Sequence, residues 1–314
     1  KFMKIFYLVL VLFSHFTFAN GPSLSKKLDH MTGKNKEVVE NPTLKTLSGS
    51  LNKYSFYSRF TYKGGSLHDP QSAERPNIRE LGAKPNLVNM SGVFGLKYRL
   101  TQNDNLSFQL GLYATTPFHS TLDTNSKTNQ NDFEKNSRKY TSDDPILSYF
   151  RTYKWGRLQN ISFFQYQYIT RKSYRDYGGR GVFRFSQASA YKINKAMYLA
   201  STLTYENYAY DKDFIDYFGK EVSIRSQQSE HTVRANISSE FYISQKISLR
   251  VITDLFSFVR YRDADNFERI NTQQTLGMTY FFSRNISLAP NIKFISSDLR
   301  SERTNFGVNL TVNI

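Results

Sequence analysis

The chain of 314 residues contains no cysteine. A disulfide framework and a metal site built on thiolates are both excluded, because each needs cysteine side chains. Tryptophan is scarce as well, with one residue, whereas the chain has 22 tyrosines and 26 phenylalanines. The stability of the protein therefore has to come from noncovalent packing and hydrogen bonding, with aromatic side chains as a major resource.

Long apolar runs are also scarce, and the mean hydropathy is −0.53. The one long run, Ile5–Phe13, follows Met3-Lys4 and precedes Thr17-Phe18-Ala19. A positive start, a short apolar core and a small residue at the end are typical of a secretory signal peptide, and the run is too short for a transmembrane helix. We therefore expect residues 1–19 to be a signal peptide that is cleaved after Ala19.

Acidic residues are in the minority, with 26 against 42 basic residues and a formal net charge of +16. Nucleic acid is a common partner of such basic proteins. Here, however, the basic residues are scattered, without a Lys/Arg-rich run or a pattern typical of a recognition helix. We therefore expect anionic lipid headgroups or anionic solutes as partners, and no nucleic acid.

Apolar and polar residues alternate along the C-terminal part of the chain, where Leu276, Met278 and Tyr280 are separated by Gly277 and Thr279. Alternation with a period of two predicts β-strands with one apolar and one polar face. The strands are long, and their polar face consists mainly of Asn, Thr, Ser and Gln. The pattern therefore favours a transmembrane barrel with a wet lumen, whose walls also explain the low mean hydropathy.

The same alternation predicts an all-β fold, an antiparallel up-and-down transmembrane barrel of about twelve strands over residues 51–314. The expected strands are Leu51–Tyr62, Leu87–Leu100, Asn105–Thr115, Pro145–Lys154, Asn160–Thr170, Val182–Ile193, Ala196–Tyr208, Glu230–Ile243, Lys246–Tyr261, Ile270–Phe282, Ile286–Phe294 and Phe306–Ile314. Short turns and longer loops alternate between them, as is typical of such barrels. Pro290 predicts a bulge, because proline cannot donate to the strand ladder. The facing of the strands at 145–170 stays ambiguous, because both of their faces carry aromatic residues.

On these features the chain resembles the Gram-negative outer-membrane β-barrel superfamily. By strand count it is similar to the small monomeric channels such as the oligogalacturonate and sialic-acid porins, which carry basic residues in the lumen. No diagnostic motif is shared, and Ile314 stands where these barrels usually end in an aromatic residue. The resemblance implies a location in the cell outer membrane, contact with outer-membrane lipid and insertion by the barrel-assembly machinery.

Residues 20–50 precede the first strand and are rich in lysine, with few apolar residues. Too little of this segment is apolar to form a core, so we expect a flexible N-terminal periplasmic arm. The alternative is a plug that folds into the barrel mouth, or a contact to the cell wall.

Because successive side chains of a strand point to opposite faces, the alternation also assigns a set of charged side chains to the inner face of the barrel. The resulting pore-lining candidates are Arg59, Lys97, Arg99, Arg184, Glu206, Arg234, Glu240, Arg250, Asp254 and Lys293. Basic residues outnumber acidic ones in this set, which favours anions in the lumen. Alternatively, opposite charges pair across the lumen and fill it.

Catalytic patterns are weak in this sequence, and the histidines lack metal-ligand spacing. Outer-membrane phospholipases carry a His-x-Ser-Asn pattern, whereas His119-Ser120 has the two residues adjacent. Aspartyl-type outer-membrane proteases use acidic pairs at the rim, for which Asp143-Asp144 and Asp211 with Asp213 are the right residue types. Solvated loops carry such residues too, so we expect neither an enzyme nor a cofactor.

Two functions follow from these patterns. The favoured one is a passive channel for small hydrophilic, preferably anionic, solutes. The alternative is a non-conducting surface barrel whose external loops, Gly64–Lys84, Pro117–Asp144 and Ala209–Ser229, mediate binding or adhesion.

Overall fold

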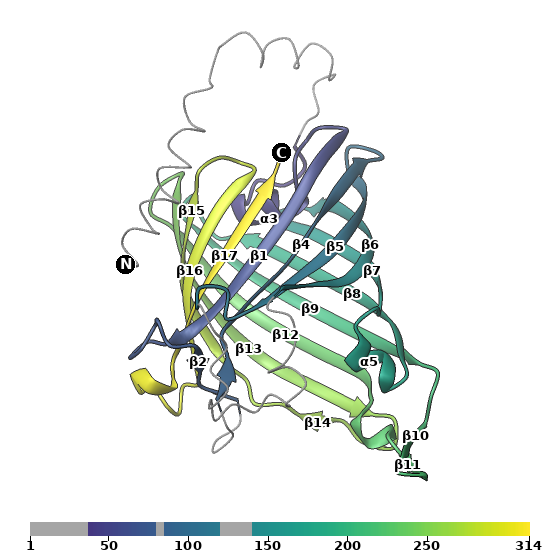
Figure 1. Ribbon diagram of the computed structural model, residues 1–314. Helices are drawn as coiled ribbons and strands as arrows, with labels where there is room; N and C mark the ends of the chain where they lie inside the picture. The colour runs from purple at the N-terminus through teal and green to yellow at the C-terminus, as the bar shows by residue number, and fades with distance from the viewer. Residues whose placement is uncertain (1–36, 80–84, 120–139) are drawn as a thin grey trace. The chain divides into compact units, whose positions relative to one another are not determined.

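A computed structural model describes residues 37–79, 85–119 and 140–314 of the chain, so the expected signal peptide and residues 20–36 lie outside the described residues. Twelve long strands form a closed antiparallel barrel (Figure 1). They are β1 (Tyr54–Ser66), β4 (Asn89–Arg99), β5 (Asp104–Thr115), β6 (Tyr140–Trp155), β7 (Leu158–Tyr168), β8 (Gly179–Lys192), β9 (Met197–Tyr210), β12 (Ser229–Tyr242), β13 (Ile247–Tyr261), β15 (Gln274–Phe281), β16 (Ile286–Phe294) and β17 (Asn305–Asn313). Because β1 pairs with β4 on one side and with β17 on the other, the sheet has no free edge. The predicted fold class and strand number are confirmed.

The remaining elements are short. They are α3 (Pro42–Ser48), β2 (Glu74–Arg75), β3 (Asn86–Leu87), α5 (Lys172–Asp176), β10 (Phe214–Tyr217), β11 (Lys220–Ser223), β14 (Glu268–Arg269) and the 3-10 turns η1 (Arg225–Gln227) and η2 (Ser301–Arg303). No helix among the described residues has the length and apolar character needed to cross a membrane.

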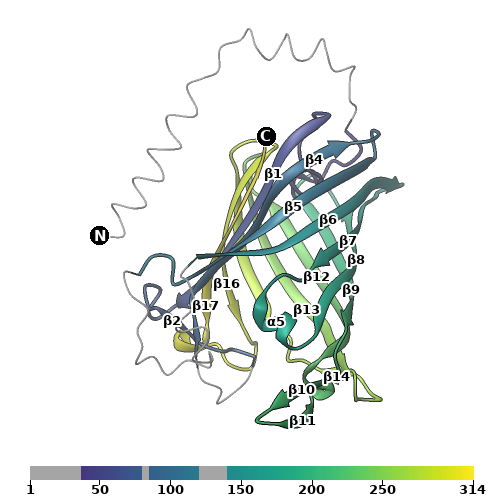
Figure 2. The same cartoon turned by 45° about the vertical axis from the view of Figure 1, so that its right-hand side comes forward.

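The two ends of the barrel differ in the length of their connections. Short turns join β4 to β5, β6 to β7, β8 to β9, β12 to β13 and β15 to β16, and we call this end the short-turn end. The other connections, including those with α5 and the β10–β11 hairpin, lie at the opposite, long-loop end (Figure 2). The start of β1 and the end of β17 both lie at the short-turn end (Figure 1).

The barrel is apolar on its outer face and polar on its inner face, as one strand shows clearly. In β5, Phe108 is 53% exposed on the outer face, whereas the flanking Ser107 and Gln109 are 2% and 6% exposed on the inner face. A water-soluble protein has the opposite arrangement, because the hydrophobic effect moves apolar side chains away from water. A belt of exposed Leu, Val and Phe around a closed sheet is instead the surface that a lipid bilayer covers.

Three local expectations are wrong. Strand β6 begins at Tyr140 rather than Pro145, because a bulge between Asp143 and Pro145 absorbs the turn-like sequence and pairing with β5 continues beyond it. Strand β15 begins at Gln274 rather than Ile270. In β13 the register with β12 shifts at Leu255, which is the extra residue between the pairs Asn236↔Asp254 and Ala235↔Phe256. Val259, which simple alternation predicts to face outward, is therefore buried, with 5% exposure.

The bulge expected at Pro290 is absent. Pro290 lies opposite Val308 of β17 in an unbroken register. Pairing with β15 has the same register on both sides of the proline, at Gly277↔Asn291 and Tyr280↔Leu288. Because proline has no N–H, the pairing of β16 with β15 is interrupted locally at this position. No extra residue is inserted, so the strand has no bulge there.

Candidate functional site

The middle of the barrel interior holds a cavity of about 620 Å³, which is lined by polar and apolar side chains of the wall and by residues of α3. Glu206 of β9 is its one acidic lining residue, and it is bound from two sides. The Arg184 Nε donates to Glu206 Oε1 over 2.6 Å, and Arg234 Nη2 lies 3.5 Å from Glu206 Oε2. The Tyr208 hydroxyl donates to the same Oε2 over 2.9 Å.

Arg59 and Arg250 also line this cavity. Within the described part of the chain neither side chain makes an ion pair, and the buried Nε of Arg250 has no hydrogen-bond partner. Four arginines thus face one carboxylate across the cavity. Because the surrounding walls have a low dielectric constant, this excess of positive charge produces a strong local field.

The other residues predicted to line a pore lie towards the two ends of the interior. Lys97, Arg99 and Glu240 are near the short-turn end, where they bond to the N-terminal segment or the adjoining turn. Asp254 and Lys293 are near the long-loop end, on the inner faces of β13 and β16. The predicted set is therefore spread along the whole interior and is not gathered in one place.

Residues 37–50 lie inside the short-turn end of the barrel, and we call them the inner segment. Its helix α3 begins at Pro42, with Asn41 as the N-cap, and ends before Gly49, whose φ is +73°. These are the residue types that start and stop helices. The expectation of a free arm is therefore corrected for residues 37–50, which the barrel interior holds by the contacts described next.

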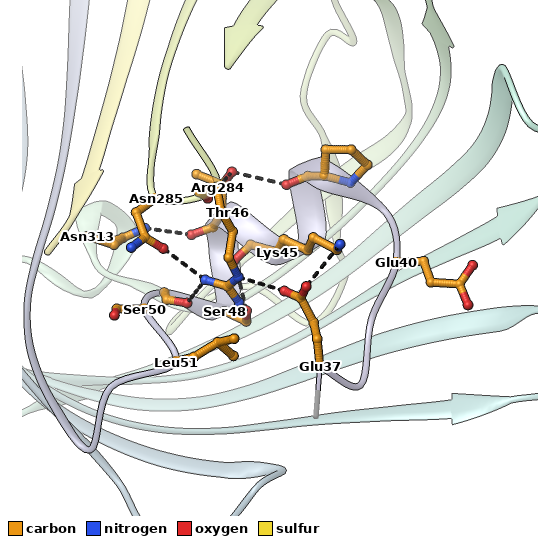
Figure 3. A network of polar contacts seen from close by, with 12 residues as sticks. Glu37, Glu40, Lys45, Thr46, Ser48, Ser50, Leu51, Arg284, Asn285 and Asn313 are labelled. Carbon is orange, nitrogen blue, oxygen red and sulfur yellow. Dashed lines mark hydrogen bonds and ion pairs between the residues drawn. The ribbon is translucent and has the colours of Figure 1, made fainter. Parts of the chain in front are cut away.

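Buried polar contacts join the inner segment to opposite walls of the barrel. The Asn41 backbone N–H donates to Gln159 Oε1 over 2.8 Å, and its side chain donates to Glu240 Oε2 over 3.1 Å. On another wall, Asn313 Nδ2 donates to the Thr46 carbonyl over 2.8 Å (Figure 3). Lys97 is 2% exposed, and its ammonium donates to the carbonyls of Ser48 and Ser50.

Arg284, in the turn between β15 and β16, is the most connected side chain of this region (Figure 3). Its Nε donates to Glu37 Oε1 over 2.7 Å, and its terminal nitrogens donate to the Gly49 carbonyl and to Ser48 Oγ. Lys45 Nζ lies 2.9 Å from the other oxygen of Glu37. One guanidinium thus holds both ends of the inner segment.

Glu40 points away from this network (Figure 3) and forms ion pairs with the opposite wall. Its carboxylate lies 2.6 Å from Lys154 Nζ and 3.1 Å from Lys192 Nζ. The hydrogen bonds from Lys154 and then Lys192 lower the pKa of Glu40 to about 2. The carboxylate therefore stays ionised, and its attachment persists, through the mildly acidic range.

An apolar patch on the inner wall explains the ambiguous facing of the strands at 145–170. Phe150 of β6 and Ile161 of β7 point inward, where they pack with Val39 and Leu44 of the inner segment. An inner wall in contact with water would carry polar residues at these positions. The sequence predicts a plug in the barrel mouth only as the alternative for residues 20–50, and the two aromatic faces on neighbouring strands are a further signal of it.

The candidate catalytic residues take part in structural contacts. Asp144, 2% exposed, accepts hydrogen bonds from Thr170 N and from the side chain of Gln167, and so holds the loop that follows β7. Asp143 pairs with Arg171 over 2.8 Å. Asp211 pairs with Arg180, and Asp213 with Arg225 and Arg262. The His119 Nε2 lies 2.8 Å from the Gln71 carbonyl.

No protein-family model and no curated protein sequence matches this chain. Among solved structures, the chain is similar to the COG4313 outer membrane channel from Pseudomonas putida F1, at 10% identity and a TM-score of 0.50, over 84% of this chain and 97% of that one. Two others are the NanC porin, at 9% identity and a TM-score of 0.44 over 83% and 98% of the two chains, and the KdgM porin, at 9% and 0.42 over 83% and 99%. The first likeness is one of fold.

Proposed function

We propose that this protein is an outer-membrane channel that passes small hydrophilic solutes and prefers anions. The observation that carries the proposal is the central cavity, where Arg59, Arg184, Arg234 and Arg250 face the single carboxylate of Glu206. A polar interior inside an apolar wall suits hydrated solutes, and the positive excess raises the local concentration of anions while repelling cations.

The inner segment is the second part of the proposed mechanism. It occupies the short-turn end directly beside the cavity, since Thr43, Thr46 and Leu47 contribute to the cavity lining. We propose that this segment narrows the path, so that the arginines act on solutes at short range. Its hydrogen bonds to several strands keep it in a defined position, which a selective constriction requires.

The test is the reversal potential of the purified protein in a planar bilayer under a KCl gradient. We expect anion preference that weakens in Arg234→Glu and fades in high salt, as the Debye length falls from about 10 Å at 0.1 M to about 3 Å at 1 M. Lys220→Glu, on the exposed β11 strand, makes the same change in net charge away from the interior and should leave selectivity unaltered. Cation preference in the native protein would contradict the proposal.

One observation favours the alternative of a binding barrel. The β10–β11 hairpin projects at the long-loop end (Figure 2), and its turn residue Phe218 is 91% exposed with a φ of +53°. Phe214 and Tyr217 of the same hairpin are also exposed. Large apolar side chains displayed on a loop are typical of contact surfaces. Correctly folded protein that conducts no ions would favour this second function.

A further inference from the structure

Four cationic side chains gather at the long-loop end of the barrel interior, and we call them the loop-end cluster. Lys63 of β1 and Lys293 of β16 point inward from strands that flank β17. Arg75 of β2 and Arg79 come from the connection between β1 and β4. Lys63 lies opposite Gly307 of β17, and Lys293 lies opposite Asn305, two residues away on the same face. Asn305 Nδ2 donates to the carbonyl of Pro76, the residue after Arg75, so the connection brings its positive charges beside the two lysines.

The cluster is poorly neutralised. Arg79 Nη2 lies 3.6 Å from Asp254 Oδ2, and this is the one ion pair that the cluster forms among the described residues. Lys63, Arg75 and Lys293 form no ion pair within residues 37–79, 85–119 and 140–314. In addition, the Nε of Arg75 is buried and has no hydrogen-bond partner there. Four positive charges therefore face one negative charge.

The connection that carries the two arginines is held in place against the barrel. Leu67 N donates to the Thr304 carbonyl over 2.7 Å, and Asn305 Nδ2 donates to the Pro76 carbonyl over 3.2 Å. Asn271 Nδ2 donates to the Arg79 carbonyl over 2.6 Å. At Gly65 a Cβ would lie 2.4 Å from the Asp69 carbonyl oxygen, so only glycine allows the connection to fold back against the barrel at this position. The arginines are thus positioned before any ligand arrives.

The buried, unpartnered Nε of Arg75 makes this arrangement of charges unfavourable by itself. Burial lowers the pKa of the Arg75 guanidinium from its ordinary value, which shows that its charge is held in a poorly solvated place. A buried N–H of a charged group without an acceptor is destabilising, because the group has lost its hydrogen bonds to water and gained none in return. An anion bound among the four side chains would accept that hydrogen bond and offset the mutual repulsion.

We propose that the loop-end cluster binds a dianionic tetrahedral oxyanion, either phosphate or the phosphate group of a small soluble ester. A guanidinium presents parallel N–H donors that match two oxygens of such a group, and lysines add point charges. The net excess of positive charge favours a dianion over chloride. A lipid headgroup is the wrong source, because Lys63 and Lys293 lie on the inner face of the barrel. The proposal deepens the anion preference proposed above, but binding requires no ion flow.

Isothermal titration calorimetry on the full detergent-solubilised chain tests this site, with inorganic phosphate and glycerol phosphate as probes at constant ionic strength in chloride. We expect saturable binding that weakens about tenfold or more in Arg75→Ala and in Lys293→Met, since each removes a charged contact. Lys293→Arg keeps the charge and should retain binding, which guards against a loss caused by misfolding. Lys220→Ala, on β11, should bind as the native protein does.

The outcomes separate this site from the channel. Saturable phosphate binding by a protein that conducts no ions supports the site and contradicts the channel. An anion-selective channel without saturable phosphate binding overturns the site alone. If Arg234→Ala weakened phosphate binding as much as Arg75→Ala does, the ligand would lie in the central cavity, and the assignment to the loop-end cluster would be overturned. Binding of chloride as tight as that of phosphate would overturn it as well.

Discussion

Arg284 offers a direct test of how firmly the inner segment is held. We consider Arg284→Met, which keeps an unbranched side chain but removes every donor. The guanidinium donates to Glu37 Oε1, to the Gly49 carbonyl and to Ser48 Oγ, so three contacts with the inner segment are lost together. The side chains of Arg284 and Glu37 are 23% and 24% exposed, so solvent screens this pair only in part.

A hydrogen bond to a charged group contributes about 1.5–3 kcal/mol. Lys45 remains beside Glu37 in the variant, so that carboxylate is not left unpaired. We therefore expect the free energy of undocking the inner segment to fall by about 2–4 kcal/mol in total. Since about 1.4 kcal/mol corresponds to a factor of ten, the undocked population should rise roughly 30- to 1,000-fold.

The absence of native cysteine makes the assay simple. A single Leu44→Cys change places a thiol in the contact between α3 and the inner wall, where Leu44 is 4% exposed. Under conditions where docking is fast relative to labelling, the rate of thiol modification reports the undocked fraction. Arg284→Met should raise this rate, whereas Arg300→Met, in an exposed ion pair with Asp298, should leave it unchanged. A labelling rate within twofold of the parent would refute the role of Arg284.

Three further predictions concern the wall, the topology and pH. Arg substituted for Leu276 on the outer face should destabilise the barrel by about 2–4 kcal/mol, and the same change at Asn309 on the cavity wall should cost less; equal costs in denaturant titrations would contradict the assignment of faces. Protease added to intact cells should cleave within residues 209–229, whereas labelling of residues 101–104 from outside would invert the topology. Because the pKa of Glu40 is lowered to about 2, its contribution to docking is fully present above its ordinary pKa near 4.5 and is lost as the pH falls towards 2. On acidification, the labelling rate of the Leu44→Cys protein should therefore rise. The rise should be smaller when the same protein also carries Glu40→Gln.

The facing of most strands could be predicted from the sequence, because a period of two has one solution wherever one face meets lipid and the other meets water. The inward positions of Arg184, Glu206 and Arg234 follow from that parity alone. Prediction of where β6 begins failed, because the bulge at Asp144 adds one residue to the strand and interrupts the alternation there.

The tertiary structure alone decided which inner residues meet each other. Local alternation places Phe150 and Ile161 on one face or the other, but only the closed barrel shows that they receive Leu44 from a segment more than 100 residues away. The same holds for Arg75 and Arg79, whose connection has no periodic pattern and reaches Lys63 and Lys293 only through its folding back against β17. Periodicity is a local property of the chain, and it determined the wall of the barrel. Contacts between segments distant in sequence depend on barrel closure, and they determined what fills its interior.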